Sequence, residues 1–182
     1  MKFKLCIILL LIIQFSCSKE KEEKIYKIGE TGPAGGVIIY SKATKTDDWQ
    51  YLEVASKDIP VFCLGSIQFT SNSGTDESIG AGKNNTMILF SLNQSSGACY
   101  SQASNFESNG FSDWYLPSRE ELKLIYLNKN IVPNLELSVR ECKSYWCSSL
   151  KKIPSSTKWL SECLSMSNGE FFSPIQIKEL DV

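Results

Sequence analysis

The sequence has no histidine among its 182 residues. Histidine is the commonest general base near neutral pH and the commonest protein ligand of transition metals. Its absence excludes Ser-His and Cys-His nucleophile pairs. A carboxylate pair could still carry out acid–base chemistry, but no spacing of Asp and Glu singles one out. We therefore predict no catalytic residues and expect a protein that is not an enzyme.

Two other kinds of site lack a sequence signature. No CxxC pair of the type that binds zinc occurs. The chain has 19 Lys and Arg residues against 20 Asp and Glu residues, so no basic field is available to attract nucleic acid. We predict no metal, no cofactor and no nucleic-acid partner.

No apolar run is long enough to span a bilayer, which takes ~20 residues. The longest run, from Leu5 to Phe15, follows two lysines, as in an export signal. It ends at Phe15-Ser16-Cys17, and a small residue directly before a cysteine is typical of a lipoprotein cleavage site. We predict a lipoprotein signal peptide over residues 1–16 and a lipid on Cys17. The alternatives are an ordinary secretory signal with an incidental cysteine, or an uncleaved signal anchor.

Lys and Glu alternate from Lys19 to Lys27, directly after the predicted lipid site. This segment has few apolar side chains to bury, so residues 17–27 are predicted to form a solvated tether, with a short exposed helix as the alternative. The lipid would hold the domain at a membrane, because membrane affinity grows with each buried methylene group. The predicted location is the cell envelope, at the outer membrane or cell surface rather than the periplasmic face of the inner membrane.

Five cysteines follow Cys17 in the sequence. In an oxidising compartment most of them should pair, but an odd number leaves one thiol over. The sequence does not fix which cysteines pair. Our hypothesis joins Cys63 to Cys99 and Cys142 to Cys163. The remaining thiol would then be Cys147, in a segment predicted to be a buried strand.

Residues 28–182 are predicted to form one α+β domain, with short antiparallel strands at both ends and two to three helices between them. β-branched or alternating runs indicate the strands, and periodic apolar residues indicate the helices. This order differs from the repeating βαβ order of a parallel sheet. The predicted elements are strands 37–40 and 49–54 joined by a polar connection over 42–48, helices 83–94, 98–106 and one that starts after Ser118, and strands 144–148, 158–163 and 171–177.

The helix that starts after Ser118 has the clearest signal. Ser118 and Glu121 form a Ser-x-x-Glu capping box, in which each side chain binds a free backbone N–H at the helix start. Leu122, Ile125 and Tyr126 then give an apolar stripe that should face the core.

The helix predicted over residues 83–94 has a less regular apolar pattern. Ile88 and Leu92 lie one turn apart and are predicted to share the core face, with Leu89 beside them. Residues three to four positions apart lie on the same face of a helix.

Three polar or glycine-rich segments are predicted to be irregular. Segments 64–80 and 149–158 are serine-rich loops, and loops on a rigid scaffold commonly bind ligands, so these are the candidate binding segments. Segment 28–36 contains several glycines and is predicted to form tight turns. A phosphate-binding loop is the alternative for 28–36, but it would need a strand before it and a helix after it.

Four blocks resemble, in the same order, the motifs of a bacterial family named for the C-terminal domain of a collagen-like adhesin. The blocks are 29–40, 79–86, 110–118 and 145–149, and the run Ser-Asp-Trp-Tyr-Leu-Pro-Ser at 112–118 is the most specific part. The resemblance implies a C-type-lectin-like fold, related to the sulfatase-modifying-factor domain, and adhesion or glycan binding at the cell surface. The chain differs from the family at Cys147, where serine is common, and after residue 173, where the family usually has a Val-Arg-x-Ile/Val-Arg strand.

The leading hypothesis is a non-catalytic binding or adhesion module for a glycan or protein ligand. Sugar-binding lectins hold calcium with Glu-Pro-Asn or Gln-Pro-Asp and Trp-Asn-Asp triplets, which are absent here. Asp113 is instead predicted to hydrogen-bond a turn and Trp114 to fill the core. One alternative function is a copper- and thiol-dependent oxidase resembling the formylglycine-generating enzymes, with Cys147 as its reactive thiol. The other is a purely structural envelope lipoprotein.

Overall fold

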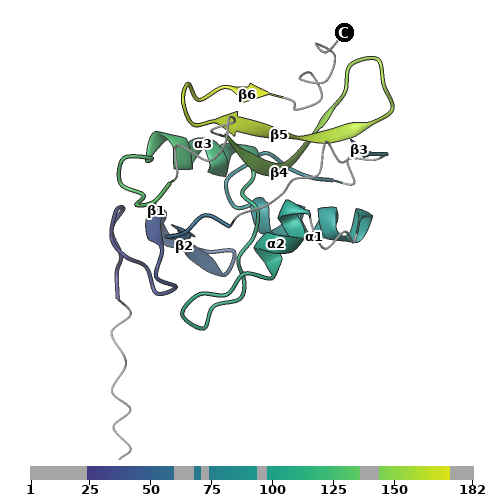
Figure 1. Ribbon diagram of the computed structural model, residues 1–182. Helices are drawn as coiled ribbons and strands as arrows, with labels where there is room; N and C mark the ends of the chain where they lie inside the picture. Colours follow the sequence, from purple (N-terminus) through teal and green to yellow (C-terminus); the bar gives the residue numbers. More distant parts are fainter. Residues whose placement is uncertain (1–23, 60–67, 71–73, 94–97, 136–143, 173–182) are drawn as a thin grey trace, which may run out of the picture.

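The chain order is strands, then helices, then strands, as the sequence predicts. The computed structural model describes residues 24–59, 68–70, 74–93, 98–135 and 144–172 (Figure 1). The α+β class is confirmed, with antiparallel strands at both ends and helices between them. Within the described ranges, no helix is long and apolar enough to cross a membrane. The elements are β1 Val37–Thr46, β2 Trp49–Val54, β3 Gln68–Phe69, α1 Gly82–Leu92, α2 Cys99–Ser104, α3 Arg119–Leu127, β4 Ser144–Lys152, β5 Trp159–Ser165 and β6 Phe171–Phe172.

β1 and β2 form a two-stranded antiparallel hairpin. Its turn consists of Asp47 and Asp48, which have φ angles of 55° and 65°. Two left-handed residues are what a type I′ hairpin turn requires. The predicted polar connection over 42–48 was therefore too long, because β1 continues to Thr46. Lys42 stabilises this extension, since its Nζ lies 3.5 Å from the ring centroid of Trp49 across the hairpin.

The second sheet is built around β5. β4 pairs with one edge of β5, and the two-residue strands β3 and β6 pair with the other edge. Two predictions are corrected here. Segment 64–80, predicted as a loop, contains β3, and segment 149–158 begins as strand, since β4 runs to Lys152. The irregular part of the second candidate segment is reduced to residues 153–158.

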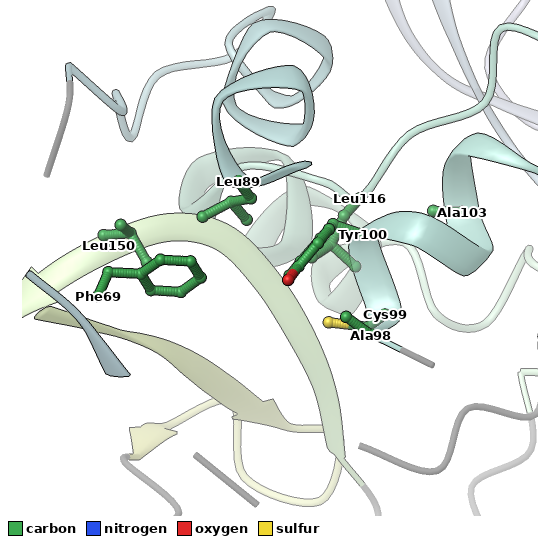
Figure 2. Packing of buried hydrophobic residues seen from close by; sticks show 8 residues of the cluster. All are labelled: Phe69, Leu89, Ala98, Cys99, Tyr100, Ala103, Leu116 and Leu150. Carbon is green, nitrogen blue, oxygen red and sulfur yellow. The ribbon is translucent and has the colours of Figure 1, made fainter. Parts of the chain in front are cut away.

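Among the described residues, three clusters of buried side chains form the core. The first lies between α1, α2 and the sheet, where Leu89 and Tyr100 face Phe69 and Leu150 (Figure 2). The second lies between α3 and the sheet, and the third joins the β1–β2 hairpin to the chain after α3. The members are Phe69, Leu89, Ala98, Cys99, Tyr100, Ala103, Leu116 and Leu150 in the first, Leu122, Cys147, Leu164 and Met166 in the second, and Ile39, Leu52 and Val132 in the third.

α3 forms as predicted. The Ser118 Oγ accepts a hydrogen bond from the Glu121 N–H at 3.3 Å, and a Glu121 carboxylate oxygen accepts one from the Ser118 N–H at 2.8 Å. Leu122 is 1% exposed, and Ile125 and Tyr126 pack beside it. Local capping and an apolar stripe therefore account for this helix.

α1 has a different buried face from the one predicted. Ile88 is only half-buried and Leu92 is 38% exposed, while Leu89 is buried together with Asn85 and Thr86. The helix is rotated so that two polar side chains face inward. Hydrogen bonds to distant segments cause this rotation.

Candidate functional site

Three of the four sequence blocks contribute to one buried network of hydrogen bonds beneath α1. They are blocks 79–86, 110–118 and 145–149. Asn85 is fully buried and lies at the centre of this network. Its Oδ1 accepts from the Asp76 N–H at 2.9 Å, and its Nδ2 donates to the Asp76 carbonyl at 2.6 Å and to the Ser148 Oγ at 3.3 Å. One amide thus connects α1, the preceding loop and β4. Backbone groups of a loop must be paired when they are buried, and Asn85 supplies that pairing.

The serines of block 145–149 hold the chain where it enters α3. The Ser148 N–H and Oγ both donate to the Pro117 carbonyl, at 2.7 and 3.0 Å. The Ser149 Oγ donates to the Asp76 carbonyl at 2.8 Å and accepts from the Arg119 N–H at 3.0 Å. These hydroxyl groups join β4 to α3 and to the loop before α1.

Thr86 joins α1 to block 110–118. Its Oγ1 accepts from the Leu116 N–H at 3.0 Å and donates to the Gly82 carbonyl one turn earlier at 2.8 Å. Because Thr86 is 2% exposed, both bonds lie inside the protein. The most specific block of the sequence therefore contributes backbone groups and packing at this point.

Glu121 is the ionisable group of the network and is 2% exposed. Its Oε1 accepts from the Gly80 N–H at 2.8 Å and lies 3.4 Å from the Tyr115 hydroxyl. Burial raises the pKa of the Glu121 carboxyl, while hydrogen bonds from Ser118, Gly80 and Gly82 lower it in part. Burial and the neighbouring Glu121 also raise the pKa of the Tyr115 hydroxyl.

The network is suited to structure rather than to chemistry. A general acid or base must come within hydrogen-bond reach of a substrate proton. Glu121, Asn85 and Thr86 are almost inaccessible, and their polar atoms bond to the chain itself. The blocks thus encode a rigid joint between α1, α3 and β4.

The glycine-rich segment 28–36 binds a carboxylate of the chain. The Glu53 side chain from β2 accepts from the Gly36 N–H at 2.5 Å and from the Ala34 N–H at 3.2 Å. A side chain at Gly32 would collide with this carboxylate. Successive backbone N–H groups can form an anion-binding nest. Here the anion is Glu53, which leaves the phosphate-loop interpretation without support.

Cys147 carries a free thiol that is 0% exposed. It packs against Leu122, Leu164 and Met166, and its Sγ lies 3.6 Å from the Ser149 carbonyl oxygen. Burial raises the pKa of this thiol to about 11. A reactive cysteine needs the opposite, a lowered pKa and access to solvent.

The other predicted cysteine sites are only partly described. Cys99 is buried on α2 in the first core cluster, and Cys163 is buried on β5. Their predicted partners, Cys63 and Cys142, lie outside the described residues, and so does the predicted lipid site Cys17. Both pairings and the lipidation therefore stay predictions. In the part of the chain that is described, no group of three or more His, Cys, Asp or Glu residues could hold a metal ion.

Asp113 and Trp114 differ from their predicted roles. Asp113 is exposed and its Oδ2 lies 3.5 Å from the Lys83 Nζ, so it pairs with α1 instead of bonding a turn. Trp114 is half-buried, edge-on to Phe106 with ring centroids 5.4 Å apart, and its buried indole N–H has no acceptor. Trp114 thus packs against Phe106 near the surface of the domain and does not fill its core.

The described part of candidate segment 64–80 also belongs to the network. The Leu150 N–H donates to the Thr75 Oγ1 at 3.2 Å, and the Ser118 Oγ donates to the Ser78 carbonyl at 2.8 Å. Residues 74–80 are therefore fixed to β4 and α3. Several of its side chains remain exposed, among them Asp76, Glu77 and Ser78, so a ligand-binding role for this segment stays a prediction.

A second feature was not predicted from the sequence, an apolar face of α1 that points to solvent. Met87 is 59% exposed and Phe90 is 43% exposed, and Lys83 lies one turn before Met87 on the same face. We call Lys83, Met87 and Phe90 the outer face of α1. Its sequence signal is the polar pair Asn85-Thr86 directly before the apolar run 87–90, since polar residues drawn inward must turn apolar ones outward.

No family model, no curated protein and no solved structure matches this chain.

Proposed function

We propose that the chain is an envelope-anchored lipoprotein whose domain is a non-catalytic binding or adhesion module. A protein ligand is favoured and a glycan is the alternative. The observation that carries the proposal is the outer face of α1, where Met87 and Phe90 are exposed on a helix whose opposite face is fixed by hydrogen bonds. A rigid element that presents apolar side chains is well suited to binding.

The composition of this face favours a protein ligand. Methionine and aromatic residues are enriched at the centres of protein–protein interfaces, and charged residues are more common at the rim. Met87 and Phe90 would supply the centre. The exposed ion pair of Lys83 and Asp113 would lie at the rim, where charges contribute to orientation more than to affinity.

The buried groups support a non-catalytic role. Among the described residues, the Glu121 carboxyl and the Cys147 thiol have shifted pKa values and could be considered as reactive groups, but each is 2% exposed or less. The oxidase alternative would need a substrate to reach the Cys147 thiol, which the second core cluster covers. The structural-lipoprotein alternative predicts that no ligand binds the outer face of α1.

We also propose a C-type-lectin-like fold for the domain. The order of elements and the meeting of blocks 79–86, 110–118 and 145–149 in one network support it, since motifs that define a fold are expected to make its internal contacts. An experimental structure of the whole chain would test this assignment.

The binding proposal is tested with arrays of extracellular-matrix proteins and glycans, probed with the full chain with and without calcium. Selective, saturable binding is expected for the unchanged chain and should fall at least roughly tenfold in Met87→Ser/Phe90→Ser, because the anchors of an interface carry most of its affinity. Leu127→Ser/Ile131→Ser is the matched control, since it replaces two exposed apolar residues elsewhere. Binding that survives the α1 change, or silence on every array, would overturn the assignment of this face.

A further inference from the structure

A second group of exposed aliphatic side chains lies where the chain enters the domain. The exposed fractions are 79% for Ile25, 55% for Ile28, 68% for Leu127 and 43% for Ile131. We call these four residues the entry patch. Exposed aliphatic side chains are individually common, but several at one place indicate an interaction surface.

The fold brings the two halves of the entry patch together. A Cβ atom added to Gly29 would lie 3.8 Å from Ile131 Cδ1, so the chain around Ile28 runs beside the turn after α3. The Ile131 N–H donates to the Asn128 carbonyl at 3.0 Å, which keeps Ile131 close to the end of α3 at Leu127. Figure 1 shows the purple start of the domain next to this green turn.

Three lysines are close to the patch residues in the sequence. Lys24 and Lys27 are exposed, while Lys129, between Leu127 and Ile131, is half-buried and donates to the Met166 carbonyl at 3.1 Å. The Lys24 Nζ lies 4.5 Å from the ring centroid of Tyr26, and the Lys129 Nζ lies 4.3 Å from that of Tyr126. An aliphatic centre with basic and aromatic neighbours is the composition of surfaces that rest in the headgroup region of a bilayer.

The predicted lipid site is close enough to place this patch at a membrane. Cys17 precedes Ile25 by eight residues, and eight residues span at most ~28 Å when fully extended. A lipid on Cys17 would thus keep the entry patch near the bilayer and give it a high effective concentration there. Any other binding partner of the entry patch would have to compete with this membrane, because the lipid would keep the membrane within that distance.

We propose that the entry patch docks on the bilayer that holds the lipid of Cys17, and so orients the domain. This inference rests on the lipidation that is part of the proposed function. α1 and the β4–β5 hairpin lie on the other side of the molecule from the chain start (Figure 1). Docking through the entry patch would therefore place α1 on the side of the domain away from the membrane, where a ligand could reach it.

The test uses the full chain, processed in bacteria and reconstituted in vesicles of phosphatidylethanolamine and phosphatidylglycerol that contain a radiolabelled phospholipid. A benzophenone-bearing amino acid is placed at position 127, or for comparison at position 157, an exposed threonine of the β4–β5 hairpin. Incorporation of labelled palmitate is measured on the same samples and reports lipidation separately from docking. The Cys17→Ser variant is the control, which should incorporate no palmitate.

Docking predicts lipid cross-links from position 127 and few from position 157. With the probe moved to position 28, Leu127→Ser/Ile131→Ser should lower its lipid cross-links roughly tenfold, because two aliphatic side chains no longer leave water. Met87→Ser/Phe90→Ser is the matched control and should leave them unchanged. A palmitate-labelled chain whose position 127 links no more lipid than position 157, or links mainly to protein, would overturn docking while lipidation stands. A chain without palmitate would overturn both.

Discussion

α1 and α3 both lie against β4, yet they are buried in opposite ways. α3 places Leu122 in the core and the exposed Lys123 outside, as an amphipathic helix should. α1 buries Asn85 and Thr86 and exposes Met87 and Phe90. The comparison teaches that one helix of this domain is held mainly by apolar packing, and the other largely by hydrogen bonds to distant segments.

The two arrangements have different consequences for function. A helix held by apolar packing uses its large side chains inside the protein. A helix held by buried hydrogen bonds can present large apolar side chains outside while its orientation stays fixed, because a fully satisfied polar network specifies one arrangement. The outer face of α1 is therefore a product of the same network that contains the sequence blocks.

The largest effect on the free energy of unfolding is expected when a buried apolar side chain of α3 is removed. Leu122→Ala removes a side chain that is 1% exposed and packed against Cys147, Leu164 and Met166. The free energy of unfolding should fall by about 3 kcal/mol, from lost burial and the cavity left behind. Urea denaturation measures this as a lower midpoint at constant slope. Leu127→Ala, on the same helix but 68% exposed, is the control and should change little; equal losses in the two variants would contradict the packing described here.

The next largest effect is expected when a buried polar side chain of α1 is removed. Asn85→Ala leaves the Asp76 N–H and carbonyl and the Ser148 hydroxyl without this partner. Buried groups left unpaired lower stability, and a loss of about 2 kcal/mol is expected. Asn84→Ala is a close control, because it removes the same side chain from the exposed neighbouring position. If both variants unfold at the same urea concentration, hydrogen bonding does not fix α1.

A smaller, pH-dependent effect is expected at Glu121, which joins the two helices. Burial raises the pKa of its carboxyl in the folded protein above the unfolded value. Its contribution to stability is therefore fully present below the unfolded pKa of about 4.3 and is lost as pH rises through the folded pKa. Relative to Glu121→Gln, the unchanged protein should be more stable at pH 4 than at pH 7.

Urea titrations of both proteins across this pH range provide the measurement. Other carboxyl groups are common to the two proteins, so their difference isolates Glu121. Glu120→Gln, one position before Glu121 in the first turn of α3, controls for the removal of a nearby carboxylate. A constant difference between the unchanged protein and Glu121→Gln at all pH values would show that the buried carboxyl does not titrate differently on folding.

Local patterns were sufficient to predict α3 and its buried face, but for α1 they predicted the helix and not its buried face. The Ser118 and Glu121 cap and the position of Leu122 depend on residues within one or two helix turns. The orientation of α1 depends on Asn85 reaching Ser148, 63 positions away. No periodicity in the chain encodes such a partner. The two-residue strand β3 was missed for a similar reason, since it exists only through its pairing with β5.

The sequence blocks also indicated where the domain is specified, but not what it binds. Block 29–40 brings Ala34 and Gly36 to the carboxylate of Glu53, a residue outside every block. The blocks that contain Asn85 and Ser148 likewise make internal bonds. Residues that fix a fold have recognisable patterns because few alternatives satisfy them. Exposed residues such as Met87 contribute little to the fold, and one sequence alone does not show which ligand they would bind.

The smallest effect on stability is expected at the outer face of α1. Met87→Ser/Phe90→Ser removes two large side chains that are 59% and 43% exposed. Each change should alter the free energy of unfolding by no more than about 0.5 kcal/mol, as is usual for surface positions. Circular dichroism and urea denaturation would measure helix content and stability. A loss as large as that of Leu122→Ala would show that these side chains belong to the core after all. An unchanged stability, together with lost ligand binding, would separate what holds α1 in place from what α1 presents.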